Sequence, residues 1–409
     1  ELDLPSHASL EVKAVWQGLA EAHRHLAELK GLCESLPNRA ILLDTLAIQE
    51  AKDSSEIENI ITTHDELYAY DQSSSASPAA KEVQNYIAAL RVGFQDVVDS
   101  GLIRMSTILR VQEAVEQNNA GFRKVPGTVL KNQTTGATVY EPPQDAALIE
   151  KLMTDLVVFI HADDELDPLL RMAIAHHQFE SIHPFYDGNG RTGRILNLLH
   201  LVLHGLLDLP VLYLSRYIVR HKQDYYRGLQ AVREEDAWEA WLLYMLSAVE
   251  ETSRETLTKV RGIRDLMQAT KQRLRSGLPK IYSQDLLNNL FRHPYTKIEF
   301  IERDLGPTGL AKSVVVVATS NEPALLPGGG GTQRVPRLVG VTEALKLITE
   351  GRQLSPADAL KKGLVHELAP RDEIVERARQ WIRKGGEGVQ PWDKKGFRVP
   401  GGVGQTSPA

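Results

Sequence analysis

The first two thirds of the chain carry apolar residues at helical spacing. Between Leu10 and Gly31 such residues recur every three or four positions and predict one helix; they are Val12, Val15, Trp16, Leu19, Ala22, Leu26 and Leu29. The same periodicity predicts further helices at about 39–52, 79–98, 106–117, 145–161, 167–181 and 237–276. We therefore expect a protein that is mainly α.

Three stretches interrupt the helical pattern. The polar run that begins at Asp53 predicts the start of a new helix, with Asp53 or Ser54 as its N-cap. Residues 73–78 are rich in Ser and predict a loop. Between Gly121 and Pro143, β-prone runs flank Thr134-Thr-Gly136 and predict a β-hairpin, which from sequence alone could be a surface feature without a function.

Composition places the chain among ordinary soluble proteins. It has 409 residues, enough for two or three domains, with 42% hydrophobic and 24% charged residues and a net charge of −6. This charge argues against nucleic acid or an anionic membrane as a partner. Cys33 is the single cysteine, which excludes an intrachain disulfide. The first residues lack the pattern of a signal peptide, and polar residues interrupt the apolar run 195–214, so we expect no membrane span and a cytoplasmic enzyme.

The densest chemistry lies between His183 and Arg194, in the sequence His-Pro-Phe-Tyr-Asp-Gly-Asn-Gly-Arg-Thr-Gly-Arg. Gly188 and Gly190 flank Asn189, so the backbone there can adopt positive φ and approach a ligand closely. Successive N–H groups in such a turn form a concave anion site. The following residues predict a helix, whose positive N-terminal end would point into the same loop.

Charged groups complete a candidate phosphate site. Arg191 and Arg194 are three residues apart, so they share one helical face and can both reach phosphate oxygens. Asp187 can bind Mg²⁺, and His183 is placed to take a proton from a hydroxyl. Each group alone has an ordinary structural explanation, as do His176 and His177, which we expect to be structural. It is the joint occurrence in one short window that favours a polyphosphate and metal site with a base beside it.

This segment resembles the signature of the Fic family, His-x-Phe-x-Asp/Glu-Gly-Asn-Gly-Arg-x-x-Arg, with each defined position filled. The resemblance implies a helical bundle with a β-hairpin flap, which transfers AMP from ATP to a Ser, Thr or Tyr hydroxyl of a target protein and forms a homodimer. It makes His183 the base, Asp187 the Mg²⁺ ligand and Phe185 a core anchor of the loop. The nucleotide-binding residues that it implies are Gly188, Asn189, Gly190, Arg191, Thr192, Gly193, Arg194 and Tyr226.

Two further segments take on meaning from this resemblance. Ser54, Glu58 and Asn59 resemble the inhibitory motif Ser/Thr-x-x-x-Glu-Gly/Asn of the subclass with an N-terminal inhibitory helix. The implied role of Glu58 is to pair with Arg194 and take the place of the γ-phosphate, since carboxylate and phosphate bind a guanidinium in the same geometry. In the hairpin, the implied flap residues that align the target are Thr138, Val139 and Tyr140.

A second feature of the resemblance concerns the base of the nucleotide. Tyr226 is the implied neighbour of the adenine, because an aromatic ring suits stacking on a base. Some members of the family place an adenine-contacting Asn a few residues later, and this chain has Arg233 there.

The last third of the chain changes character. Residues 279–305 resemble the first two helices of a winged helix-turn-helix, and 306–409 resemble part of the crotonase (enoyl-CoA hydratase) family, which implies a small mixed α/β tail. The tail lacks the earlier glycine segment and the two acidic residues that hydration requires, so we predict no hydratase activity. We expect an N-terminal region with the inhibitory helix at 1–100, a catalytic domain at 101–250, a linker with the partial winged helix at 251–305 and the crotonase-like part at 306–409.

Three other functions stay open from the sequence. The same site could remove AMP or transfer a different phosphate-containing group. The partial helix-turn-helix could belong to a DNA-binding regulator, although its missing recognition helix argues against this. The tail could belong to an enzyme that acts on a CoA ester.

Overall fold

The structure is a computed structural model, and it describes residues 2–6, 10–35, 39–63, 67, 77–131, 136–277, 279 and 282–292. Beyond residue 300 it describes only isolated positions and short stretches, of which 356–362 is the longest. Contacts divide the chain into two units, Glu1–Val315 and Val316–Ala409. In the second unit the described helix is α17 (Pro356–Lys361). Three predictions lie largely outside the described residues: the loop at 73–78, the second winged-helix helix, and the crotonase-like tail.

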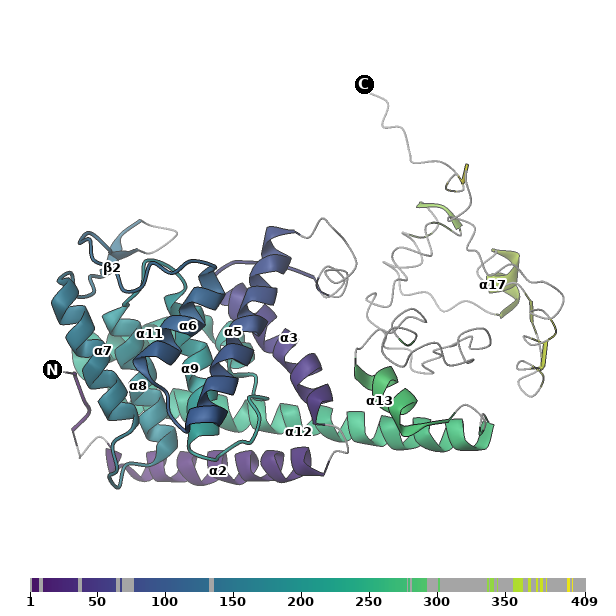
Figure 1. Cartoon of the computed structure of the whole chain (residues 1–409), viewed down its shortest axis with the longest axis horizontal. Coiled ribbons are helices and arrows are strands. Elements are labelled where there is room, and N and C mark those ends of the chain that lie inside the picture. The colour runs from purple at the N-terminus through teal and green to yellow at the C-terminus, as the bar shows by residue number, and fades with distance from the viewer. Residues whose placement is uncertain are drawn as a thin grey trace. The chain divides into compact units, whose positions relative to one another are not determined.

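The first unit is a bundle of α-helices with one small β-hairpin (Figure 1), so the predicted class, mainly α with a hairpin, is confirmed. The described helices are α2 (Lys13–Glu34), α3 (Ala40–Ile57), α5 (Pro78–Ser100), α6 (Met105–Glu116), α7 (Ala146–Ile160), α8 (Pro168–Ile182), α9 (Asn189–Leu203), α10 (Leu214–Arg220), α11 (Lys222–Glu235), α12 (Trp238–Gly277) and α13 (Gln284–Arg292). The strands β1 (Leu130–Lys131) and β2 (Thr138–Tyr140) are antiparallel. Among the described helices, none has the length and hydropathy that crossing a membrane requires.

Two buried helices form the centre of this unit and position the candidate site. Helix α9 packs against α5, α6 and α8, and α8 packs against α7, α9 and α12. Both helices are buried on nearly every face, which is typical of a helix at the middle of a bundle. Phe185, between them, is fully buried and packs on Phe122 with ring centroids 5.2 Å apart. The loop that joins α8 to α9 is thus held by the core at both ends.

Local sequence explains where several helices begin. Ser77 caps α5 by accepting a hydrogen bond from Ala80 N, 3.2 Å away, and Pro78 occupies the first turn. Asp145 caps α7 in the same way, and Asp167 caps α8 ahead of Pro168. These side chains satisfy backbone N–H groups that have no partner inside the helix.

Helix α2 and the long helix α12 pack along each other (Figure 1). The predicted stripe of α2 faces this contact, because Val15, Leu19, Leu26 and Leu29 are all at most 4% exposed. Trp16 is an exception: we expected it in the stripe, but it is 57% exposed, since it follows Val15 directly and a neighbouring residue points about 100° away around a helix.

The prediction that a new helix begins at Asp53 or Ser54 is wrong. Helix α3 runs without a break from Ala40 to Ile57, so both residues lie inside it. Ser54 is fully buried and its hydroxyl oxygen accepts a hydrogen bond from Arg194, so tertiary contact replaces local capping. The helix ends instead at Glu58, and Asn59 follows with a φ of 64°. Asn tolerates this left-handed conformation, which ends a helix.

A buried carboxyl group fastens α3 to its neighbours. Glu50 is 2% exposed and accepts hydrogen bonds from Tyr86 Oη (3.2 Å) on α5 and from Ser215 N (3.1 Å) and Oγ on α10. Burial raises the pKa of Glu50 to about 7, although the hydrogen bonds from Ser215 oppose the shift. Glu50 lies four and eight residues before Ser54 and Glu58, so all three share one face of α3.

Tight packing at Gly93 predicts a loss of stability on substitution. A Cβ there would lie 2.6 Å from Leu199 Cδ1 and 2.9 Å from Val111 Cγ2, and both of these side chains are fully buried. We expect Gly93→Ala to lower the free energy of unfolding by about 1–3 kcal/mol, measured by chemical denaturation. The control is Gly262→Ala on α12, where a Cβ meets nothing within 4 Å and the change should add about 1 kcal/mol. Equal effects at the two glycines would contradict this account of the α5–α9 contact.

Because Glu50 is buried, we predict that replacing its carboxyl group by an amide raises the free energy of unfolding, and raises it more as the pH increases. Its folded-state pKa is raised from 4.5 to about 7, so the stability that the neutral carboxyl provides is complete below pH 4.5 and is lost as the pH rises through 7. Glu50→Gln stays neutral, so its free energy of unfolding should rise relative to wild type by about 1.4 kcal/mol per pH unit between pH 5 and 7. Glu113→Gln, on the exposed face of α6, is the control. A difference for Glu50→Gln that does not change with pH would refute the prediction.

Candidate active site

The loop between α8 and α9 is held in shape by Asn189. Its Oδ1 accepts a hydrogen bond from Phe185 N and its Nδ2 donates one to Phe185 O, both at 2.8 Å. Gly188 precedes α9 with a φ of 75°, a conformation that favours glycine. The side chain of Asn189 is thus committed to the loop, and it is the free N–H groups of the first turn of α9 that can bind an anion.

Arg194 is buried against the end of α3. It is 2% exposed, and its Nε donates to Ser54 Oγ at 2.7 Å while its Nη2 donates to Ser54 O at 3.0 Å. Nη2 also lies 2.7 Å from Oε1 of Glu58. The structure therefore brings together Ser54, Glu58 and Arg194, which the sequence places 140 and 136 residues apart.

The carboxylate of Glu58 bridges both arginines of the motif. Its Oε2 lies 2.8 Å from Nε of Arg191, which makes an ion pair without the geometry of a hydrogen bond. A Cβ on Gly190 would lie 2.7 Å from Oε1 of Glu58, so only glycine lets the carboxylate come this close to the first turn of α9. Glu58 thus occupies the position at this helix N-terminus that a phosphate group would favour.

Two further carboxylates hold Arg191, and the sequence analysis missed them. Nη2 of Arg191 lies 2.7 Å from Glu116 Oε1 at the end of α6, and Nη1 pairs with Glu82 on α5. Arg191 is 3% exposed and the side chain of Glu116 13%, so this pair is largely shielded from water, whereas the side chain of Glu82 is 39% exposed. Glu116 also lies within 2.5 Å of where a Cβ on Gly188 would be. Glu82 and Glu116 are 109 and 75 residues from Arg191, and no local pattern marks them.

His183 ends α8 and has a neutral imidazole. Its backbone is left-handed, with φ 47° and ψ 60°, and burial lowers its pKa to about 4, with the guanidinium groups of Arg123 and Arg233 adding to the effect. Within the described residues, Nδ1 of His183 is buried without a hydrogen-bond partner. Asp187 is exposed, and its Oδ1 accepts a hydrogen bond from Gly188 N at 2.8 Å.

The hairpin lies against α8 and α11 close to His183. Tyr140 Oη donates to Ser181 O at 3.0 Å, and Gln230 Nε2 donates to Val139 O at 3.2 Å. Arg233 lies 3.9 Å above the Tyr140 ring, and its Nε donates to Ser181 Oγ at 3.0 Å. Thr138 and Val139 are exposed. Arg233 therefore binds the flap, in the position where some family members have an adenine-contacting Asn.

The remaining predicted residues divide between the site and the core. Tyr226 is 49% exposed, while Thr192 is fully buried. Gly193 is packed against α8, because a Cβ there would lie 2.7 Å from Glu180 Oε1 and 3.0 Å from Phe179. Gly193 thus belongs to the contact between α8 and α9, and Thr192 belongs to the buried interior. Asn59 is exposed at the end of α3, where its Oδ1 accepts a hydrogen bond from Lys222 at 3.3 Å.

His176 and His177 have the structural place that we expected. Both are buried and pack on aromatic rings of α11 and α12, and His176 Nε2 lies 2.8 Å from Tyr225 Oη. Burial lowers their pKa values to about 3 and about 4, so both are neutral at neutral pH.

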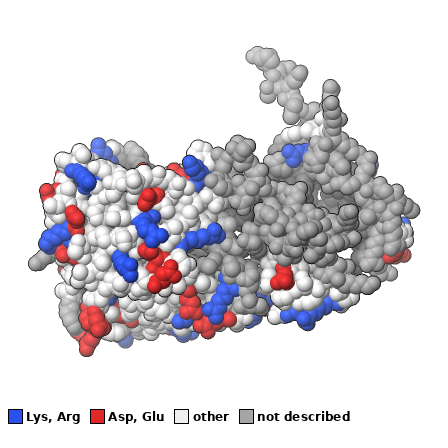
Figure 2. All heavy atoms as spheres, in the orientation of Figure 1, with Lys and Arg blue, Asp and Glu red and all other residues white. Residues whose placement is uncertain are grey.

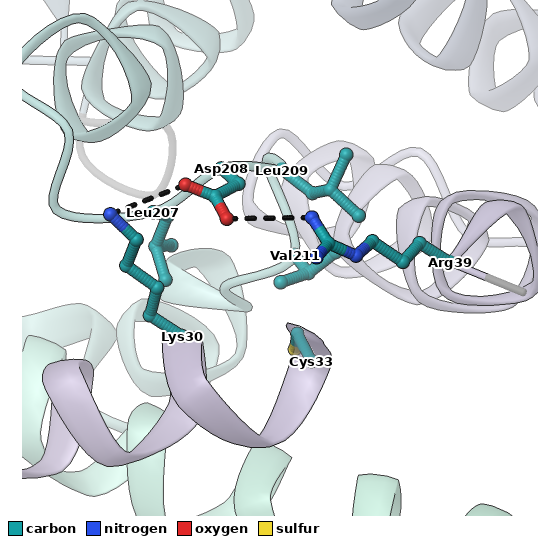
Figure 3. Close-up of a pocket in the computed structure, with 7 residues that line it drawn as sticks. All are labelled: Lys30, Cys33, Arg39, Leu207, Asp208, Leu209 and Val211. Atoms are coloured by element: carbon teal, nitrogen blue, oxygen red, sulfur yellow. Dashed lines mark ion pairs between the residues drawn. The ribbon is translucent and has the colours of Figure 1, made fainter. Parts of the chain in front are cut away.

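A small pocket elsewhere contains Cys33 but no reactive group (Figure 3). Asp208 lies there between Lys30 Nζ and Arg39 Nη1, at 3.2 and 3.5 Å. Burial raises the pKa of Cys33 to about 11, so its thiol is protonated and a poor nucleophile at neutral pH. On the face drawn in Figure 2, acidic and basic side chains of the helical body are interspersed.

Four family models match successive parts of the chain. Residues 16–95 match the Fic/DOC family N-terminal region, and 103–201 match the Fic/DOC family itself. Residues 266–309 match the C-terminal domain described as protein adenylyltransferase SoFic-like, and 315–389 match enoyl-CoA hydratase/isomerase.

Comparison with individual proteins separates the two units. The fatty acid oxidation complex subunit alpha of Shewanella frigidimarina is 49% identical over 67 residues, and that of Shewanella baltica is 46% identical over 70 residues, both in the crotonase-like part. These matches cover 16% and 17% of this chain but 9% and 10% of the relatives, so the chain spans about a tenth of their length.

The helical unit has the fold of a solved Fic protein. The crystal structure of a Fic family protein from Desulfovibrio desulfuricans G20 is similar with a TM-score of 0.54 and 22% identity, over 74% of this chain and 90% of that one. This likeness concerns the fold. The matched regions show that the chain belongs to the Fic family over residues 16–201 and continues into a part similar to enoyl-CoA hydratases.

Proposed function

We propose that this protein is a self-inhibited, Mg²⁺-dependent adenylyltransferase, which moves AMP from ATP to a Ser, Thr or Tyr hydroxyl of a target protein. The coarser assignment, a Fic-type transferase, follows from the matched regions. The observation that carries the finer one is the carboxylate of Glu58, which bridges Arg191 and Arg194 over the first turn of α9. Two buried guanidinium groups at a helix N-terminus are an anion site, and Glu58 fills it.

The chemistry assigns a task to each group around the loop. The neutral imidazole of His183 takes the proton of the target hydroxyl, whose oxygen forms a bond to the α-phosphorus of ATP. The bond from that phosphorus to the bridging oxygen breaks, and pyrophosphate leaves. The N–H groups at the start of α9 and the guanidinium of Arg194 stabilise the negative charge on the phosphates. Tyr226 borders the base, and the flap residues 138–140 align the target.

The residues present fit a magnesium ion. Asp187 offers an exposed carboxylate beside the anion site, and Mg²⁺ is usually held by one or two carboxylates together with substrate phosphates. When bound, the ion would neutralise charge on the phosphates of ATP. Asp187 would hold it, and the N–H of Gly188 already orients one oxygen of this carboxylate.

Inhibition follows from competition for the same donors. A γ-phosphate and the carboxylate of Glu58 would both need Arg194, so ATP is held productively only after Glu58 has left. An enzyme that removed AMP would need Glu58 as a base, and loss of this carboxylate would then abolish its activity. The substitution of Glu58 therefore separates the two functions.

The first test is transfer of labelled AMP from ATP. We expect Glu58→Gly to raise transfer, because it frees Arg194 for phosphate, and His183→Ala in that background to lower it by about 10²–10⁴-fold. Glu56→Gly is the control, since Glu56 lies on the same helix but pairs with Lys52, 3.0 Å away. Transfer that falls in Glu58→Gly, or that survives without the imidazole, would count against the proposal.

The second test uses pH. With a pKa of about 4, His183 is already an uncharged base throughout the neutral range. For the Glu58→Gly protein we expect kcat/KM for ATP to show no acid limb near the ordinary histidine value of about 6.5. The measurement is the initial rate from pH 5 to 8.5. A half-maximal rate near pH 6.5 that is absent from a His183→Ala baseline would disprove the neutral-base mechanism.

A further inference from the structure

Arg123 ties three separate backbone segments together. It lies between α6 and β1, and its side chain is 1% exposed. Its Nε donates to His183 O at 2.7 Å, and its Nη2 donates to Ile182 O at 3.2 Å and to Pro143 O at 2.5 Å. Its backbone N donates to Pro184 O at 2.9 Å. One residue thus joins the end of α8 to the segments before and after the hairpin.

This guanidinium is buried without an acidic partner. Among the described residues, no carboxylate lies within ion-pair distance of Arg123, and burial lowers its pKa. A buried charge is costly unless it is compensated, and here three carbonyl oxygens supply the compensation. Arg171, on α8, is a contrasting case. It is as buried as Arg123, but it pairs with Asp164 as well as donating a hydrogen bond to Phe159 O at 2.7 Å.

The backbone that Arg123 holds is an unusual one. His183 is left-handed, a conformation that costs free energy in a residue other than glycine and persists where surrounding contacts impose it. Arg123 binds the carbonyl groups on both sides of this residue's N–Cα bond, those of Ile182 and His183. The orientation of the imidazole follows from this backbone.

A second contact strengthens the same junction. Tyr186 Oη accepts hydrogen bonds from Lys124 N at 2.9 Å and from Val125 N at 3.3 Å. Residues 123–125 are therefore joined to residues 182–186 by hydrogen bonds from the side chain of Arg123 and from the backbone N–H groups of residues 123–125. The entry to the hairpin and the segment that carries His183 form one unit.

We propose that Arg123 is a positioning residue, which sets the imidazole of His183 in register with the flap. The inference rests on the proposed function, in which the flap holds the target and His183 removes its proton. The distance from base to hydroxyl then depends on a joint between flap and base, and Arg123 is that joint. A misplacement of about 1 Å at such a point can cost about 10²-fold in rate.

The first experiment measures turnover in the Glu58→Gly background. Because the target is unidentified, water serves as the acceptor, and the His183-dependent conversion of ATP to AMP and pyrophosphate is followed. We expect Arg123→Met to lower kcat by about 10²-fold and leave KM for ATP within about twofold, since the hydrogen bonds of Arg123 go to none of the residues assigned to the phosphates. Arg123→Lys should recover only part of kcat, because a single ammonium group cannot bind all three carbonyl groups.

Arg171→Met is the matched control. It removes an equally buried guanidinium from α8, the helix whose C-terminal end Arg123 binds, so it should lower Tm at least as much as Arg123→Met while leaving kcat unchanged. If Arg123→Met keeps kcat within threefold, or if both variants lose kcat in proportion to Tm, the inference is overturned.

The second experiment does not depend on activity. In hydrogen exchange of the whole protein, we expect Arg123→Met to speed exchange together in peptides that cover 181–186 and 140–146, and Arg171→Met to leave both unchanged. Unchanged exchange at these two segments in Arg123→Met would overturn the inference that Arg123 joins them. If exchange changes as expected but the Glu58→Gly protein never converts ATP, the proposed function has failed, and with it the catalytic part of this inference.

Discussion

The carboxylate of Glu58 between Arg191 and Arg194 is the contact on which the rest of the site depends. Both guanidinium groups are at most 3% exposed, and buried charge without a partner is strongly destabilising. Arg191 also pairs with Glu82 and Glu116, but among the described residues the carboxylate within ion-pair distance of Arg194 is that of Glu58. In the proposed function a triphosphate would replace this carboxylate, because its phosphate groups offer a guanidinium negative charge in the same geometry. Binding of the nucleotide and departure of Glu58 would then be one exchange.

The two sides of the Glu58 contact come from different regions of one chain. Glu58 and Glu82 lie in the region that matches the N-terminal Fic model, while Glu116, Arg191 and Arg194 lie in the region that matches the Fic model itself. The N-terminal region thus supplies two of the carboxylates that pair with the arginines of α9. On one side of the Glu58 contact, Glu50 fastens α3 to α5 and α10. On the other side, the packing of α9 against α5, α6 and α8 fixes the position of the arginines. Arg191 pairs with Glu82 and Glu116 as well as Glu58, whereas among the described residues Arg194 pairs with Glu58, so the two arginines are not equivalent.

The part of the chain after 315 is organised separately. The boundary between the two units, Val315 and Val316, coincides with the point where the hydratase-like match begins, at residue 315. Its relatives are matched over only about a tenth of their length. The sequence predicts no hydratase activity for this segment, because the earlier glycine segment and the two acidic residues are missing. The candidate site that the described residues form lies in the helical unit.

Sequence by itself determined whatever depends on residues close together in the chain. Helical periodicity located most helices, and the run from His183 to Arg194 contains its own turn, helix start and charges, so its candidate chemistry could be read locally. The tertiary structure alone decided what depends on distant residues. It extended α3 through Ser54, because Arg194, 140 residues away, binds that hydroxyl. It also brought Glu82, Glu116 and Arg123 to the loop, and none of them stands in a local pattern, because a buried charge is satisfied by whichever group the packed chain places beside it.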